Sequence, residues 1–253
     1  MNLNVCGILS KLHNELFFDE CVKYDILCFT ESKINDVDNE KVKQHFDAAG
    51  YKVYFKNRSK MNRIRSGGIM IACKNEIAKY VKECNSPCNF VKWIRLSKEL
   101  TGYNENLLLG TVYIPPRQSP FACDEVYERI EADLSNVVRE DDLVLLCGDF
   151  NSHTSAGADY VEIDDVHGLP SSDIKQTIVS CGANLVRISM DRSKDTYGQK
   201  LLDMCKNTNM LILNGRIGCD KLEGKTLINK NTLYSRLLCG LSTYLVSCKG
   251  IIY

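Results

Sequence analysis

The stretch LVLLCGDFNSHT (Leu143–Thr154) contains the strongest indication of a fold in this sequence. It opens with a short, wholly apolar run, of the length and composition expected of a buried strand. Gly148, Asp149 and Asn151 follow directly, and these residue types favour a turn. Loops carried by a rigid scaffold are a common place for functional side chains. The stretch therefore predicts a central strand that ends either in a functional turn or in a purely structural one.

Similar short apolar runs, rich in Val, Ile, Leu, Tyr and Phe, recur along the chain. Their length and composition favour strands over helices. The runs are Leu3–Ile8, Ile26–Thr30, Lys52–Phe55, Ile69–Cys73, Phe90–Leu96, Leu107–Ile114, Leu143–Cys147 and Met210–Leu213.

Longer amphipathic stretches lie between some of these runs. Asp124–Arg139 and Tyr197–Asn207 each place apolar residues on one helical face, whereas Asp19–Val22 and Asn39–Ala49 are weaker helix candidates. The second helix is expected to be capped by Asp195 or the residue after it. Several strands follow one another without a helix between them, so a simple alternation of strand and helix does not hold. The pattern predicts one domain over residues 1–253, with mixed or antiparallel sheets and peripheral helices.

Composition sets outer limits on function. The 253 residues carry 32 Lys and Arg against 32 Asp and Glu, so the formal net charge is zero. Hydrophobic content of 44% and charged content of 25% exclude collagen-like and mostly disordered classes. No apolar run approaches the roughly 18 residues of a membrane span, and Lys11 and Glu15 near the start predict that no signal peptide is present. Binding to nucleic acid would therefore depend on local basic clusters or on a metal.

The cysteines indicate a reducing compartment. There are 13 of them, an odd number, and they are scattered through apolar stretches, where Cys behaves as a small hydrophobic residue. Cys84 and Cys88 form the only tight spacing, and no second Cys or His pair is available to complete a zinc site with them. The cysteines are therefore interpreted as structural.

Oxygen-bearing side chains stand at or just beyond the ends of three predicted strands: Asn4, Glu31, and the pair Asp149 and Asn151. Taken singly, an acid after a strand is often only a turn former or a helix cap. Together, two carboxylates and two amides would form an oxygen-rich site. Such a site suits a hard divalent cation that keeps a substrate phosphate as a further ligand.

The order and wording of four segments resemble the endonuclease/exonuclease/phosphatase superfamily, most closely the endonuclease domain of non-LTR retrotransposons. The segments are LNVCGILSKL, DILCFTESKI, GTVYIPP and GDFNSHT, and RISMD, YGQKLLDMC and LILNGRIG resemble the retroelement branch in particular. The resemblance extends over about residues 2–220. It implies a deoxyribonuclease I-like fold of the α/β class, with two mixed β-sheets packed as a sandwich and helices on the outer faces.

The resemblance also implies a role for each of five residues. Asn4 and Glu31 would be metal ligands, with Glu31 the principal one. Asp149 would orient or deprotonate the attacking water, and Asn151 would hold the transition-state oxygen. Tyr113 would contact the scissile phosphate, although Tyr113 alone could equally be a buried aromatic residue with a satisfied hydroxyl.

A local basic cluster fits a polyanionic substrate. The run KNRSKMNRIR, which contains Arg58, Lys60, Arg63 and Arg65, has no acidic residue. A basic loop of this kind can bind phosphates and release their counterions. The other interpretation is a solvated hairpin tip, because runs of charge are commonly solvated.

Two elements of the family pattern are absent from the sequence: an Asp on a late strand, in a phrase such as IDYV, and a Ser-Asp-His triad. The four histidines are His13, His45, His153 and His167, and none belongs to such a triad. His153 is interpreted as a loop residue, and Cys6 stands where abasic-site endonucleases carry an Asp. The tail over residues 227–253 is interpreted as divergent or truncated. This predicts a fold that is incomplete at its C-terminus, with an open sheet edge, and a weak or inactive enzyme.

The resulting prediction is divalent-metal-dependent hydrolysis of DNA phosphodiester bonds by a nicking endonuclease of the retrotransposon type, impaired in this chain. Mg²⁺ or Mn²⁺ is the expected cofactor and DNA the expected partner, with no small-molecule cofactor and no membrane association. The expected location is intracellular, and nuclear if the retrotransposon resemblance holds. Two alternatives stay open: a phosphatase of the same fold acting on inositol phosphates, and a non-catalytic nucleic-acid-binding remnant.

Overall fold

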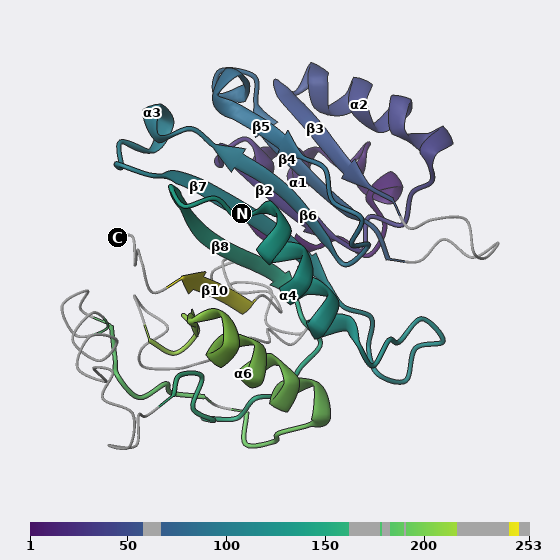
Figure 1. Ribbon diagram of the computed structural model, residues 1–253. Helices are drawn as coiled ribbons and strands as arrows, with labels where there is room; N and C mark the ends of the chain where they lie inside the picture. Colours follow the sequence, from purple (N-terminus) through teal and green to yellow (C-terminus); the bar gives the residue numbers. More distant parts are fainter. Residues whose placement is uncertain (58–66, 162–177, 179–182, 190, 217–242, 248–253) are drawn as a thin grey trace.

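Two β-sheets lie face to face in the computed structural model, which describes the chain except for residues 58–66, 162–177, 179–182, 190, 217–242 and 248–253 (Figure 1). The first sheet has the strand order β1-β2-β4-β3, and its strands are β1 (Asn2–Asn4), β2 (Ile26–Thr30), β3 (Tyr51–Lys56) and β4 (Ile69–Lys74). The second has the order β5-β6-β7-β8-β10-β9. Its strands are β5 (Val81–Cys84), β6 (Val91–Leu96), β7 (Asn106–Tyr113), β8 (Asp142–Asp149), β9 (Met210–Ile212) and β10 (Thr243–Ser247).

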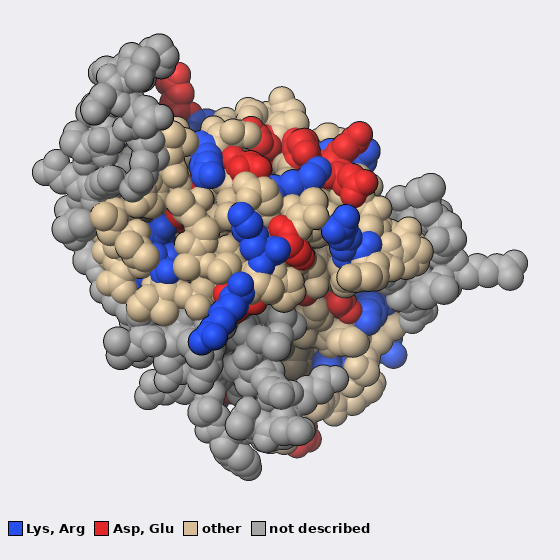
Figure 2. All heavy atoms as spheres, turned by 90° about the horizontal axis from the view of Figure 1, so that it is seen from below, with Lys and Arg blue, Asp and Glu red and all other residues tan. Residues whose placement is uncertain are grey.

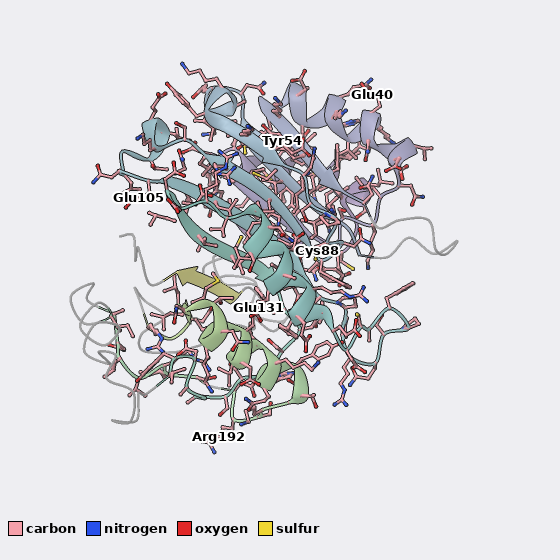
Figure 3. The ribbon with its side chains drawn as sticks, in the orientation of Figure 1. Glu40, Tyr54, Cys88, Glu105, Glu131 and Arg192 are labelled. Atoms are coloured by element: carbon pink, nitrogen blue, oxygen red, sulfur yellow. The ribbon has the colours of Figure 1, made fainter. Side chains whose placement is uncertain are left out.

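Helices cover the outer faces of this sandwich (Figure 1). The helices are α1 (Glu15–Cys21) and α2 (Asn39–Ala48) on the first sheet, and α4 (Val126–Val137) and α6 (Thr196–Thr208) on the second. Shorter turns are α3 (Lys98–Thr101), η1 (Ile8–Lys11), η2 (Asp36–Asp38) and η3 (Ala78–Tyr80). Asn207 of α6 donates a hydrogen bond to Glu131 of α4. Figure 3 shows the Glu131 side chain between these two helices. No described helix is both long and apolar enough to cross a membrane.

Apolar side chains fill the space between the sheets as well as the space under the helices. Cys28 and Ile71 of the first sheet belong to one buried cluster with Ile94, Leu109 and Cys147 of the second. Separate clusters lie beneath the helices on each outer face. The central strands are therefore buried on both faces, which explains why they appear in the sequence as continuous apolar runs rather than as alternating ones.

Both sheets are mixed, and the predicted sandwich with outer helices is confirmed. β1 pairs with β2 in parallel, β7 pairs with β8 in parallel, and the other strand pairs are antiparallel. β1 of the first sheet also approaches β8 of the second. The ends of these parallel pairs consequently meet where the two sheets come together.

The structure differs from the sequence-based expectation at three elements. The strand expected at Leu3–Ile8 ends at Asn4, because Cys6 and Gly7 adopt positive φ angles of 46° and 103° that interrupt an extended chain. The edge strand β5 was missed, since its charged residues Lys82 and Glu83 obscure a strand pattern. Edge strands often carry such charges.

The third difference lies in the tail. Within the described residues, β8 is not left as an open edge, because β10 pairs antiparallel with both β8 and β9. The sequence of β10, Thr-Tyr-Leu-Val-Ser, is rich in residues that favour strands. The predicted divergence of residues 227–253 from the family pattern otherwise falls outside the described residues and stays a prediction.

Candidate active site

Four of the predicted site residues meet where the sheets join. Asn4 ends β1, Glu31 follows β2, Tyr113 ends β7 and Asp149 ends β8. The Asn4 side-chain amide donates to Glu31 Oε1 at 3.2 Å and to Asp149 Oδ2 at 3.0 Å. The Tyr113 hydroxyl donates to the same Glu31 oxygen at 3.1 Å. The two carboxylates therefore share one amide group, with one carboxylate contributed by each sheet.

Asn151 lies next to this group and ties two loops together. Its backbone N–H donates to Asp149 Oδ1 at 3.2 Å, and its side-chain Nδ2 donates to the carbonyl oxygen of Ile114 at 2.7 Å. A primary amide has two N–H donors. The second N–H of Asn151 is thus the one that could serve a substrate oxygen.

Lys33 is a member of the site that sequence analysis missed. Its ammonium lies 2.9 Å from Glu31 Oε2 and donates to the Cys6 thiol at 3.2 Å. Both Glu31 and Lys33 have a left-handed backbone, with φ angles of 52° and 50°. The sequence alone does not predict that Lys33 contacts Glu31, because the contact between residues two positions apart depends on this unusual backbone conformation.

Long-range backbone hydrogen bonds hold the segment after β2 in place. Gly7 N donates to Glu31 O at 2.8 Å, Ser32 N to Gly68 O at 3.2 Å, and Lys33 N to Gly67 O at 2.9 Å. A left-handed backbone conformation at a residue other than glycine costs free energy. It persists only where surrounding contacts hold it in place, and such positions are often found at functional sites. The backbone around Glu31 therefore has the character of a preorganised site.

We expect Gly68→Ala to disturb this arrangement. Gly68 has a φ angle of 87°, and a Cβ atom there would lie 2.5 Å from the Oγ of the buried Ser32. The variant should lose about 1 kcal/mol or more in its free energy of unfolding, measured by urea denaturation. Gly50→Ala, where a Cβ atom would meet nothing within 4 Å at a similar φ of 82°, separates the backbone effect from the clash. Equal losses in the two variants would contradict the clash with Ser32.

The two carboxylates have different protonation properties. Burial raises the pKa of Asp149 to about 6. Hydrogen bonds from Asn4 and from the backbone of Asn151 favour the ionised form and lower this pKa, but burial has the larger effect. Burial also acts to raise the pKa of Glu31, but hydrogen bonds from Lys33, Asn4 and Tyr113 outweigh it and leave that pKa lowered. Glu31 is therefore ionised at neutral pH, and Asp149 is suited to accepting a proton near neutral pH.

The donor set fits a Mg²⁺ or Mn²⁺ ion. No group of three or more His, Cys, Asp or Glu side chains that could hold a metal occurs among the described residues. Mg²⁺, however, is commonly bound through one or two carboxylates, with water and substrate phosphate as its other ligands. Glu31 supplies a carboxylate. Asn4 directs its amide N–H group at the two carboxylates, and its amide oxygen accepts from Cys6 N at 3.1 Å, so the amide would have to turn over to offer that oxygen to a cation at Glu31. The single charge of Lys33 leaves the pair of carboxylates with excess negative charge.

The predicted DNA-binding residues Arg58, Lys60, Arg63 and Arg65 lie outside the described residues. Lys56, at the start of the same basic run, is described, and it donates a hydrogen bond to Ser86 O. Figure 2 shows basic side chains interspersed with acidic ones on the face seen from below, without one broad patch of a single sign. This distribution agrees with the zero net charge.

The comparisons with known proteins show the family. The family model described as Endonuclease/Exonuclease/phosphatase family matches residues 1–162, so this chain belongs to that family of enzymes acting on phosphate esters. The match includes Asn4, Glu31, Tyr113, Asp149 and Asn151. Their individual roles stay predictions.

Solved structures of nucleic-acid enzymes share the fold. An AP endonuclease from Archaeoglobus fulgidus matches with a TM-score of 0.50 and 17% identity, over 97% of this chain and 85% of that one. The AP endonuclease LMAP from Leishmania major matches with a TM-score of 0.59 and 14% identity, over 97% and 78%. The 3′ phosphatase NExo from Neisseria, bound to a product DNA hairpin, matches with 0.52 and 14%, over 97% and 85%. A search of curated proteins found no match.

Proposed function

We propose that this chain is a divalent-metal-dependent DNA endonuclease of the non-LTR retrotransposon type, with Mg²⁺ or Mn²⁺ as its cofactor and the nucleus as its place of action. The observation that carries the proposal is the amide of Asn4, which joins Glu31 and Asp149 across the two sheets. Structural neighbours that include AP endonucleases and a DNA-bound phosphatase support nucleic acid as the substrate.

The geometry divides the work of phosphodiester hydrolysis among the side chains. A bound divalent cation would supply positive charge at the phosphoryl oxygen, and Glu31 and Asn4 would hold it. Asp149 accepts a proton from the attacking water, because its pKa of about 6 leaves it mostly ionised at neutral pH. Asn151 offers its second amide N–H to a non-bridging oxygen of the phosphate.

The proposed activity is slow compared with that of a family member that carries the late-strand Asp and the Ser-Asp-His triad. The sequence contains no Ser-Asp-His triad and, after α6, no Asp in an IDYV-like phrase, and a missing acid or base of this kind commonly costs 10²- to 10⁴-fold. Nicking at least about 100-fold slower than by a relative that has both elements is therefore expected.

Conversion of supercoiled plasmid to the nicked form tests the proposal. We expect the chain to nick the plasmid slowly in Mg²⁺ or Mn²⁺ and not at all in EDTA. We expect no nicking by the Glu31→Gln variant. Glu40→Gln, on the outer helix α2 (Figure 3), is the matched control because its side chain is exposed and accepts a hydrogen bond from Gln44 of the same helix. Release of phosphate from inositol phosphates without any nicking would favour the phosphatase alternative, and DNA binding without hydrolysis would favour the non-catalytic remnant.

The basic run makes a separate prediction about DNA binding. Replacing Arg58, Lys60 and Arg63 by Ala should make the logarithm of the DNA association constant fall less steeply with the logarithm of salt concentration. The slope should change by about one for each DNA phosphate that the variant no longer neutralises. Fluorescence anisotropy at several salt concentrations measures it, with Lys41→Ala and Lys43→Ala on α2 as the control. An unchanged slope would indicate that the basic run is a solvated surface segment that does not contact DNA phosphates.

A further inference from the structure

His153 and Asp191 form a hydrogen-bonded pair that the roles above do not use. His153 Nδ1 lies 2.5 Å from Asp191 Oδ2. The other oxygen of Asp191 accepts from both the backbone N–H and the hydroxyl of Ser193, at 2.9 Å and 2.6 Å. Ser193 thus holds one oxygen of the Asp191 carboxylate, and the other oxygen orients the imidazole ring of His153.

The backbone of His153 is fixed by the start of α6. Its N–H donates to Asp195 Oδ1 at 3.2 Å, and its carbonyl oxygen accepts from Asp195 N at 3.0 Å. The same Asp195 oxygen caps α6 by accepting from Gly198 N at 2.6 Å. A Cβ atom on Gly198 would lie 1.8 Å from His153 O, so only glycine leaves room for this docking.

The histidine also shares its loop with the proposed catalytic residues. It follows Asn151 by two positions, and Asn151 is tied to the end of β7 through Ile114. The loop after β8 is therefore held by β7 at one point and by α6 at another. The His153 side chain is nevertheless 60% exposed, and its Nε2 makes no hydrogen bond to any residue that the structure describes.

The contribution of the His153–Asp191 pair to the stability of the fold is too small to explain why so many contacts hold it in place. An exposed ion pair contributes only about 0–1 kcal/mol, whereas the pair here is supported by Ser193, Asp195 and Gly198. A fixed imidazole with one nitrogen on a carboxylate and the other facing solvent is the arrangement that proton transfer requires.

We propose that His153, oriented by Asp191, is the proton donor to the leaving oxygen of the scissile phosphodiester. This inference rests on the proposed endonuclease function. Water forms a new bond to phosphorus and gives its proton to Asp149, while the bond from phosphorus to the leaving oxygen breaks. The leaving oxygen takes the proton from Nε2 of His153. No electrons are exchanged, and the slow nicking depends on this residue.

The test uses the full chain and plasmid nicking in Mn²⁺. His153→Ala should lower the nicking rate about 100-fold, while its dissociation constant for DNA in EDTA changes less than about 2-fold. His153→Gln, which keeps a donor to Asp191 but cannot transfer a proton, should lose as much. Asp191→Asn should lose about 10-fold, and the double variant His153→Ala with Asp191→Asn should be no slower than His153→Ala.

Two controls sharpen the result. Arg192→Ala changes an exposed residue next to Asp191, which Figure 3 shows pointing away from the molecule, and should leave the rate unchanged. Added imidazole should restore nicking by His153→Ala, since the position is open to solvent, but should not restore Glu31→Gln.

The outcomes separate the two claims. Nicking by the unaltered chain together with full activity of His153→Gln would overturn the proton-donor role and leave the endonuclease function standing. Equal losses in rate and DNA affinity, or additive losses in the double variant, would also overturn it. An unaltered chain that does not nick DNA at all would overturn both, because no leaving oxygen would then need a proton.

Discussion

A chain in which residues 217–253 are replaced by a segment carrying a late-strand Asp and a Ser-Asp-His triad should nick plasmid DNA at least about 100-fold faster than the original. The reason is that the residues proposed for metal binding and water activation are present, whereas these two elements are not. The new segment must also supply a strand in the place of β10, because β10 lies between β8 and β9.

Nicking rates of the two proteins, measured side by side with and without EDTA, check this expectation. Glu31→Ala or Asp149→Ala in the repaired chain should abolish the gain. Rapid nicking by the original chain, equal to that of a family member with both elements, would contradict the prediction and would make His153 sufficient by itself. A repaired chain that folds, as judged by circular dichroism, but stays slow would indicate decay elsewhere in the site, with Cys6 the first position to test.

Asp149→Asn should abolish nicking and yet stabilise the metal-free protein. Burial raises the pKa of Asp149 from its ordinary value of 3.8 to about 6, so keeping the carboxylate ionised in the folded state costs about 3 kcal/mol above pH 6. An amide avoids this cost but gives up one hydrogen bond, from Asn151 N, worth about 1 kcal/mol. The variant should therefore gain about 2 kcal/mol at pH 8.

The pH dependence has a definite sign. A carboxyl group whose pKa is raised in the folded state contributes stability in its protonated form, and that contribution is lost as pH rises from about 4 through about 6. Near pH 4 the Asn variant should thus be about 1 kcal/mol less stable than the original, because only the lost hydrogen bond counts there. Its advantage should appear as pH rises and reach its full size above pH 6. Urea denaturation in EDTA at pH 5 and pH 8 measures it. A variant less stable than the original at pH 8 would show that Asp149 is not a strained group.

The sequence predicted the parts of the site that lie on regular elements. Asn4, Glu31 and Asp149 end apolar strands, and the meeting of strand ends follows from packing those strands in a sandwich. The approach of Lys33 to Glu31 could not be predicted, because it depends on left-handed backbone angles stabilised by Gly67 and Gly68, far along the chain.

The pair of His153 and Asp191 shows the same limit. These residues are 38 positions apart, and neither lies in a periodic segment. Their contact exists because Asp195 docks the loop after β8 on the first turn of α6. The sequence does predict α6 and narrows its N-cap to Asp195 or Thr196, of which the structure shows Asp195, since helix periodicity and N-cap preferences are local properties.

The amide of Asn4 that joins Glu31 and Asp149 has a mechanical consequence. Each carboxylate is attached to a different sheet, so this amide links the two sheets at the edge where their strands end. A ligand that binds both carboxylates would bind only the folded chain, and the stability it adds would rise with the logarithm of its concentration. The proposed substrate site would therefore also join the two sheets, and the melting temperature of the protein would report whether a ligand occupies it.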